Sequence, residues 1–443
     1  MIKSVAVTIL AVVLFTSCSP STSPADPSSP HALAEKRASI PWWRQLNDSS
    51  LNHDVTAAFS ANPSLQTVAL RINQADAVVA KARASTLPRL NLGFGYREGR
   101  RQEVDFGPYD LAPWKSSAVF SWEIDVTGKL RAAQKSASEN RSAAVWDYHS
   151  ARILIASRIA SVRMNLYRFN AEITNLEEAL SANQRTLDSL TERSQAGLIP
   201  DSVLDKQRAE DERLKRTQLD LERLRDLTVV QLRTLRGGTN PSGTSRSSFP
   251  SPSALSTNPL NQLLASHPEI LAADARVRSA FQLQRSARLN LLPSLQINLL
   301  ATGAQKTLVD RFQTWTTEVG PSLDIPIYDP ARIAVLKSRQ AQAKIAASEY
   351  RTTVLNILEE IDTARINLKS RRAQLASAQR ETQALTRTRK NAREQFDAGL
   401  TSQIEYLDTE RRWLDAKRSQ AAVQQTMLDA QINLIKATGG GRL

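Results

Sequence analysis

The sequence has few of the residues from which catalytic and metal sites are built. Its 443 residues include one cysteine, three methionines and four histidines. The histidines are scattered: His31, His53, His149 and His267. A metal site needs several ligands at close spacing. No glycine-rich phosphate loop follows a predicted strand, and no Ser/His/Asp set stands out. We therefore expect no metal site and no cofactor, and we predict that the protein is not an enzyme.

A dense basic tract is also missing, although the chain is basic overall. It carries 58 Lys and Arg against 44 Asp and Glu, a formal net charge of +14. The basic side chains are spread along the sequence and mixed with acids, and aromatic residues make up only 5%. Nucleic-acid binding usually needs a concentrated basic patch or an aromatic stacking platform. We expect no nucleic-acid partner.

Glycine and proline are absent from two long stretches, residues 129–196 and 331–398, each of 68 residues. The dipeptides Gly197-Leu198 and Gly399-Leu400 close them. An uninterrupted helix of this length would extend roughly 100 Å at about 1.5 Å per residue. Globular helices typically run about 8–20 residues, so these stretches predict a rod, a coiled coil or a duct.

The chain is written twice, with a period of about 202 residues. The long stretches repeat at this distance, and so do the proline pairs Pro63/Pro88 and Pro268/Pro293, each 25 residues apart. Whatever the protein does, it does with two copies of one unit.

Mostly apolar residues of the first long stretch alternate in steps of four and three, and adding 202 carries this series onto the second stretch, with polar residues at Asn183, Arg371 and Thr382. The first series is Ile155, Ile159, Val162, Leu166, Phe169, Ile173, Leu176, Leu180, Asn183, Leu187 and Leu190. The second is Ile357, Ile361, Ala364, Leu368, Arg371, Leu375, Ala378, Thr382 and Leu385. An average spacing of about 3.5 residues is typical of a coiled coil. By itself this pattern is also compatible with a solvated structural rod.

The N-terminus predicts export from the cytoplasm. Lys3 precedes an apolar run over residues 5–15, and small residues lead to Cys18. This pattern is typical of a signal peptide, and the run is too short for a membrane-spanning helix. It resembles a bacterial lipoprotein signal, which implies removal of residues 1–17 and lipidation of Cys18. By the same resemblance, Ser19 favours sorting to the outer membrane. An ordinary signal peptide with a free cysteine is the alternative.

Four short segments alternate between apolar and polar residues. Their apolar positions are Leu90, Leu92, Phe94 and Tyr96; Ala118, Phe120, Trp122, Ile124 and Val126; Leu295, Ile297 and Leu299; and Trp315, Val319, Leu323, Ile325 and Ile327. This period of two is typical of transmembrane β-barrel strands, and equally of half-buried soluble strands. Four strands cannot close a barrel with a lumen, and an open sheet edge cannot lie in lipid. A membrane location would therefore require oligomerisation.

Taken in order, these features resemble the TolC family of outer-membrane efflux proteins, in its NodT-type lipoprotein branch paired with RND pumps. The resemblance covers residues 42–443. The motifs that carry it are Trp42-Trp43, residues 122–130 (WEIDVTGKL), the two Ala-Gly-Leu turns, and the glycine-rich end after Thr438. There are two departures. Thr438 stands where the family usually has leucine. The first turn also looks one residue shorter, because Leu204 follows Gly197 by seven while Leu407 follows Gly399 by eight.

The resemblance implies a mainly α fold with β, in which internally duplicated long coiled-coil hairpins accompany four strands per protomer. A homotrimer would form a 12-stranded transmembrane β-barrel in the outer membrane and a helical tunnel in the periplasm. The implied function is passive conduction of substrates from an inner-membrane pump, of RND type, through a periplasmic adaptor. The alternatives are the outer-membrane component of type I protein secretion and a non-channel periplasmic coiled-coil adaptor.

The expected domain boundaries follow the repeat. They are a signal peptide at 1–17, a Ser/Pro-rich linker at 18–41, a first repeat at 42–240 (strands about 89–127, helices about 129–236), a linker at 241–260, and a second repeat at 261–443 (strands about 294–328, helices about 331–437).

Two sets of residues are candidates for functional contacts. The first is the pair of turns, where glycine permits a tight reversal and the leucines have no core to enter. We expect these turns to contact the adaptor: Gly197, Leu198, Ile199, Pro200, Gly399, Leu400, Thr401 and Ser402. Turn residues needed only for the hairpin are the alternative.

The second set is Glu405 and Asp408, whose spacing of three places both carboxylates on one helix face. By resemblance this face lines the periplasmic constriction, where threefold symmetry would form two acidic rings that favour cations. Alternatively, both side chains simply solvate the helix or pair with Arg411 and Arg412.

Overall fold

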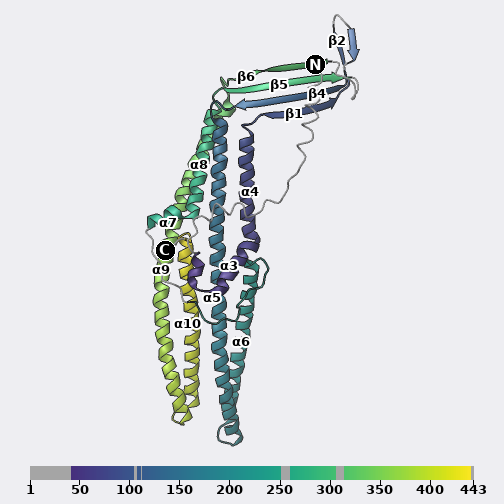
Figure 1. The fold of residues 1–443 in the computed structure, drawn as a ribbon. Coiled ribbons are helices and arrows are strands. Elements are labelled where there is room, and N and C mark those ends of the chain that lie inside the picture. The colour runs from purple at the N-terminus through teal and green to yellow at the C-terminus, as the bar shows by residue number, and fades with distance from the viewer. Residues whose placement is uncertain (1–40, 104–106, 111, 251–259, 306–313, 441–443) are drawn as a thin grey trace. The chain divides into compact units, whose positions relative to one another are not determined.

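The computed structural model describes residues 41–103, 107–110, 112–250, 260–305 and 314–440 (Figure 1). This part of the chain is mostly α-helical and contains a four-stranded antiparallel sheet, so the predicted mainly α fold with four main strands per protomer is confirmed. None of the described helices combines the length and apolarity of a bilayer-crossing helix.

The helices confirm the two long stretches and the internal repeat. In chain order they are the 3₁₀ helix η2 (Trp42–Leu46), α3 (Ser49–Ala61), α4 (Pro63–Ala84), α5 (Lys129–Gln195), α6 (Asp201–Leu235), α7 (Leu260–Ser266), α8 (Pro268–Leu289), α9 (Pro330–Asp397) and α10 (Gln403–Ala437). Helices α5 and α9 contain 67 and 68 residues. Helices α6 and α10 contain 35 residues each, and α4 and α8 contain 22 each. The duplication in sequence is therefore a duplication of helical units.

Proline and a polar cap set the start of the matching helices α4 and α8. The Asn62 side chain accepts a hydrogen bond from the Leu65 backbone N–H at 3.2 Å, and Pro63 occupies the first turn. In the second repeat, Nδ1 of His267 accepts from the Glu269 N–H at 3.3 Å ahead of Pro268. Proline is tolerated there because the first amides of a helix lack intrahelical partners.

The four-stranded sheet joins strands from both repeats. Its order is β1 (Arg89–Tyr96), β4 (Trp114–Ile124), β5 (Ser294–Gln305) and β6 (Thr314–Asp324), with each neighbouring pair antiparallel. Within the described chain, β1 and β6 are the edge strands. The prediction missed a second, two-stranded sheet of β2 (Arg100–Glu103) and β3 (Gly107–Asp110).

The strand register brings the predicted apolar positions onto one face. Leu90 lies opposite Phe120, Phe120 opposite Leu299, and Leu299 opposite Val319. Side chains alternate between faces along a strand, so these four form a row across the whole sheet. On the other face Asn298 donates to Ser322 at 2.9 Å. The sheet thus has an apolar face and a largely polar face.

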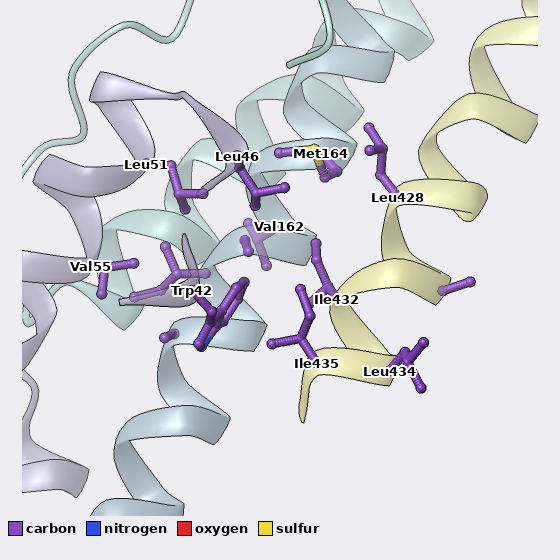
Figure 2. Packing of buried hydrophobic residues seen from close by; sticks show 14 of the residues in the cluster. Trp42, Leu46, Leu51, Val55, Val162, Met164, Leu428, Ile432, Leu434 and Ile435 are labelled. Carbon is purple, nitrogen blue, oxygen red and sulfur yellow. The ribbon is translucent and has the colours of Figure 1, made fainter. Parts of the chain in front are cut away.

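The predicted coiled-coil seams are largely buried. On α5, every seam position except Ile155 and Leu180 is buried, and on α9 the exception that stands fully exposed is Arg371. Seam residues of α5 enter two larger cores, and Leu187 and Leu190 enter a third, small cluster with Leu204. The large core includes Trp42, Leu46, Val55, Ile159, Leu166, Tyr167, Leu428 and Ile432 (Figure 2). The hairpin core consists of Phe169, Ile173, Leu176, Ala179, Leu214, Leu221, Trp413 and Leu414.

An ion cluster is buried beside the large core. Asp54 on α3 pairs with Nη2 of Arg163 on α5 at 2.7 Å and with Nη1 of Arg236, just past α6, at 2.8 Å. The side chains of Asp54 and Arg163 are fully buried. Arg163 also donates to the Ser242 carbonyl at 2.7 Å. These contacts fix the loop that leaves the first repeat to the middle of α5.

Candidate functional site

Each long hairpin reverses at a glycine in the left-handed conformation. Gly197 has φ of 71° and Gly399 has φ of 73°. The amide of Leu198 bonds to the Arg193 carbonyl at 2.9 Å, and that of Leu400 bonds to the Gln395 carbonyl at 2.8 Å. This is the six-to-one bond of a Schellman helix end, in which glycine avoids the steric cost of positive φ. The strands adjoin the N-terminal ends of α5 and α9, so the turns lie at the other ends of the hairpins (Figure 1).

The two leucines beside these glycines are left in solvent. Leu198 is 73% exposed and Leu400 is 79% exposed. Ile199, by contrast, packs against a small buried cluster that contains Leu190 and Leu204. The leucines therefore contribute little to the hairpins themselves, and each leaves an apolar side chain exposed at its turn.

The other tip residues start the returning helices. Pro200 directly precedes α6 without a side-chain cap. Ser402 caps α10 by accepting from the Glu405 N–H at 3.3 Å, and Thr401 donates to Oε2 of Glu405 at 2.7 Å. Thus Thr401 and Ser402 have a structural role in starting α10.

The expectation of a shorter first turn is wrong. Residues 196–200 separate α5 from α6, and residues 398–402 separate α9 from α10, so the turns have equal length. Leu204 and Tyr406 are both buried, and each follows its glycine by seven residues. Tyr406 stacks on Phe396 with ring centroids 5.0 Å apart. The counterpart of Leu204 is thus Tyr406, and matching leucine to leucine gave the false offset.

Glu405 and Asp408 are both exposed in the single chain. Asp408 pairs with Nε of Arg412 at 2.9 Å, one turn further along α10. Arg411 does not join them. Its Nη2 lies 2.9 Å from Oε2 of Glu210 on α6. Of the two arginines considered as structural partners, Arg412 therefore pairs with the acidic face, while Arg411 connects the two hairpins.

The contact between Glu210 and Arg411 was not predicted. Glu210 is buried and also receives two hydrogen bonds from Arg213, at 2.6 and 2.9 Å. Burial acts to raise its pKa, but hydrogen bonds from Arg213 and Arg411 outweigh burial and hold the pKa below its ordinary value. An i,i+3 pair with Arg213 could be read from the sequence, whereas the bond across hairpins depends on how the helices pack.

Known proteins with a similar sequence match both repeats of the chain. A sequence profile described as "Outer membrane efflux protein" matches residues 55–238 and 260–440. The chain belongs to the outer membrane efflux protein family. As a member it is an outer-membrane component of an efflux system, and its two matched segments correspond to the two repeats.

Relatives match almost end to end. Over 430 residues the chain is 26% identical to the pyoverdine export outer membrane protein OpmQ of Pseudomonas putida, covering 94% of this chain and 90% of that protein. It is 24% identical to the toluene efflux pump outer membrane protein TtgF, also of Pseudomonas putida, with 91% and 86% covered. It is likewise 24% identical to the probable outer membrane lipoprotein SilC of Salmonella typhimurium, with 90% and 88% covered.

Solved channel structures share the fold. The outer-membrane channel OprN superposes with a TM-score of 0.81 at 20% identity, covering 92% of this chain and 94% of that one. The outer membrane protein VceC of Vibrio cholerae gives 0.78 at 23% identity, covering 91% and 100%. Both long hairpins and the sheet thus belong to an arrangement already seen in outer-membrane channels.

Proposed function

We propose that the chain is the exit duct of a tripartite efflux system. Three copies form a β-barrel through the outer membrane and a helical tunnel in the periplasm. Substrates delivered by an inner-membrane pump of RND type, through a periplasmic adaptor, pass along this path without chemical change. The observation that carries the proposal is a four-stranded sheet with one apolar face, attached to two long helical hairpins.

The sheet supports assembly from several copies. Edge strands β1 and β6 have no partner along their outer sides within the described chain. Lipid offers no hydrogen bonds, so an open edge there leaves backbone groups unsatisfied at several kcal/mol each. Pairing β6 of one copy with β1 of the next removes both edges. The apolar row through Phe120 and Leu299 then faces lipid, and the polar face lines the lumen.

Deleting the gene tests the efflux function in the producing cell. The deletion strain should accumulate a fluorescent pump substrate, such as ethidium, severalfold more than the parent. It should accumulate as much as a strain that lacks the cognate pump, and plasmid-borne protein should restore export. Unchanged accumulation with loss of one secreted protein would instead indicate type I secretion.

We propose that the adaptor docks on the two tips. The support is the exposure of Leu198 and Leu400, which the hairpins do not use. Leu198→Asp combined with Leu400→Asp should abolish efflux while trimer abundance stays unchanged. Gln195→Asp with Gln395→Asp is the matched control, because it adds the same charges beside the tips and keeps the leucines. Loss of the trimer in the leucine variant would mean that these residues serve only the hairpins.

We also propose that Cys18 carries lipid. This residue lies outside the described residues, and the support is its place after an apolar signal sequence, together with a relative named as a lipoprotein. Mass spectrometry of the mature protein should find an acylated N-terminus at Cys18. Cys18→Ala should still assemble in the membrane, because one acyl chain holds a protein far more weakly than a barrel does. An unmodified cysteine would contradict the proposal.

A further inference from the structure

The two edge strands of the sheet carry opposite charges on its polar face. On β1, the charged side chains of this face are Arg89 at the start of the strand and Arg97 directly after its end. On β6 they are Glu318 and Asp324. Side chains alternate between faces along a strand, which places all four opposite the apolar face. All four are exposed. On this face the sheet therefore has a basic edge and an acidic edge.

Most of these charges have no partner within one copy. Among the described residues, none of Arg89, Arg97 and Glu318 forms a side-chain hydrogen bond or an ion pair. Asp324, in contrast, pairs with Nη2 of Arg332 at 2.7 Å. Glu318 is thus the acidic side chain of the open β6 edge that remains available to a neighbouring copy.

One backbone hydrogen bond fixes the hand of the sheet. The Arg97 N–H donates to the Pro113 carbonyl at 2.8 Å, which continues the ladder between β1 and β4. Polar-face residues of β1 therefore direct their N–H and C=O groups toward β4. Because the residues are L-amino acids, β4 then lies to the left of β1 when the apolar face is viewed with Arg89 at the bottom. The strands β5 and β6 follow further to the left, and β1 of the next copy would follow β6.

Closing a barrel displaces the next copy along its strands. Strands in a closed barrel tilt by about 35–45°, and their right-handed twist directs this tilt to the right in the same view. The next β1 lies four strand spacings away, which is about 19 Å. Over this distance the tilt shifts the register by about 13–19 Å, or about four to six residues. The shift brings each residue of β6 beside a higher-numbered residue of β1.

This shift brings Glu318 close to Arg97 of the next copy. Within one copy, the row of paired residues through Gly320 of β6 ends at Arg89 of β1. A shift of about four or six residues places Gly320 beside residue 93 or 95 of the next copy, since only an even number keeps polar residues on the polar face. Glu318 then lies beside residue 95 or 97. Long side chains reach both a directly opposite partner and a diagonal one about 7–8 Å away, so Glu318 reaches Arg97 in both registers.

We propose that Glu318 of one copy forms an ion pair with Arg97 of the next copy on the luminal face, and that this pair sets the register in which three copies close the barrel. The same shift brings Arg89 of the next copy opposite or diagonal to Asp324. The acidic edge of one copy therefore meets the basic edge of the next at two places. The inference rests on the trimeric barrel of the proposed function.

Register selection is the role that such a pair can perform. An exposed ion pair adds little stability by itself. Strand β1, however, has Gly93 and Gly95 between its two arginines, and glycine-rich strands specify their register weakly. Opposite charges that lie side by side favour one alignment, whereas like charges in that place disfavour it. Glu318 and Arg97 thus supply information that the glycines do not.

Exchanging the two charges in the full-length protein tests the pair. Glu318→Arg and Arg97→Glu should each lower severalfold the fraction of trimer that remains after heating in mild detergent, because like charges then meet between copies. Glu318→Arg combined with Arg97→Glu should restore the wild-type fraction. Glu318→Arg with Arg89→Glu is the matched control and should restore nothing, because Arg89 lies about 20–26 Å along the strand from the position beside Glu318. Single variants as stable as the wild type, or an exchanged variant without recovery, would overturn the proposal.

Cross-linking gives a second readout that does not depend on a loss of stability. Glu318→Cys with Arg97→Cys, treated with a short bifunctional methanethiosulfonate, should yield covalently linked trimers. Glu318→Cys with Arg89→Cys should yield none, and links through position 89 instead of 97 would overturn the register. A monomeric wild-type protein would reject the proposed assembly together with the pair. A wild-type trimer that shows neither charge rescue nor the expected link would reject the pair and leave the duct standing.

Discussion

Helices α5 and α9 have nearly the same length and occupy equivalent places in the two repeats, yet their surroundings differ. Helix α5 packs against α3, α4, α6, α8 and α10, while α9 packs chiefly against α8 and α10. Burial follows: 24 residues of α5 are buried but only 8 of α9. Several large apolar side chains of α9 are exposed, including Ile345 at 56%, Leu355 at 66% and Ile366 at 69%.

The difference shows that a duplicated sequence can serve two environments. Helix α5 finds its neighbours within its own chain, whereas α9 retains apolar side chains for which the described chain supplies no cover. The strand that leads into α9 is β6, an edge of the sheet. Within one copy of the chain, the outer edge of β6 is thus unpaired and the apolar face of α9 is uncovered. We interpret α9 and β6 as the side on which the next protomer packs.

The largest effect is expected from charging the uncovered face of α9. Leu355→Asp with Ile366→Asp should abolish the trimer, because an interface that buries these side chains would then bury two unpaired charges. Size-exclusion chromatography with light scattering would detect the loss. Asn367→Asp is the control, since it adds a charge at a neighbouring exposed polar position. A trimer that survives the double substitution would remove α9 from the interface.

A large effect on the stability of each chain is expected from breaking the buried ion cluster around Asp54, which holds α5. Asp54→Ala leaves Arg163 and Arg236 buried without their shared carboxylate, which typically costs about 3–5 kcal/mol. Thermal unfolding of the purified protein should show a clear decrease in Tm. Asp362→Ala on α9 is the comparison, because its pair with Arg365 is exposed and should contribute at most about 1 kcal/mol. Equal losses would contradict the difference between the two helices.

A smaller effect is expected where the two hairpins touch. Arg411→Ala removes a partner of buried Glu210 and should cost about 1–3 kcal/mol, whereas Arg412→Ala removes only the exposed pair with Asp408 and should cost below about 1 kcal/mol. Exchange protection of α6 near Glu210 reports the difference. Identical results for these adjacent arginines would mean that the link contributes nothing.

The link at Glu210 should weaken in strong acid. Its pKa is lowered, so its contribution to stability is present above the ordinary glutamate pKa and is lost as the pH falls below that value. Exchange protection of the amides near Glu210 should therefore fall in strong acid. Glu210→Gln should abolish the acid-dependent loss. An acid-dependent loss that persists in the Glu210→Gln variant would contradict this assignment.

The smallest effect is expected at the proposed gate. Glu405→Ala with Asp408→Ala should lower cation selectivity by about two- to threefold and relieve block by trivalent cations, if the exposed carboxylates form rings in the pore. Single-channel recording in planar bilayers measures both quantities. Asp397→Ala, at the opposite side of the same turn, is the control for an exposed acid on α9. Unchanged selectivity and block would mean that the two carboxylates face elsewhere.

The features predicted from the sequence are those that depend on local patterns. The absence of glycine and proline predicted α5 and α9, the glycines predicted the turns, and alternation predicted β1, β4, β5 and β6. The pair of strands β2 and β3 was not predicted, because these short strands lack alternation between apolar and polar residues. The false offset of the first turn arose from residue type, since tyrosine at 406 fills the place of leucine at 204.

Contacts between helices far apart in the sequence could not be predicted. Glu210 and Arg411, or Glu172 and Arg418, meet only because α10 lies beside the first hairpin in a particular rotation. A heptad pattern fixes which face of a helix is buried, but not which partner covers it. These polar contacts therefore required the structure.

Native mass spectrometry of the full-length protein, extracted in mild detergent, tests the central claim most directly. That claim is that the chain is complete only as a threefold assembly, with the sheet edges and the open face of α9 covered by neighbouring copies. The account predicts one dominant species with three times the mass of the mature chain, which dissociates in the Leu355→Asp/Ile366→Asp variant. A stable monomer, or a dimer that the variant leaves intact, would contradict it.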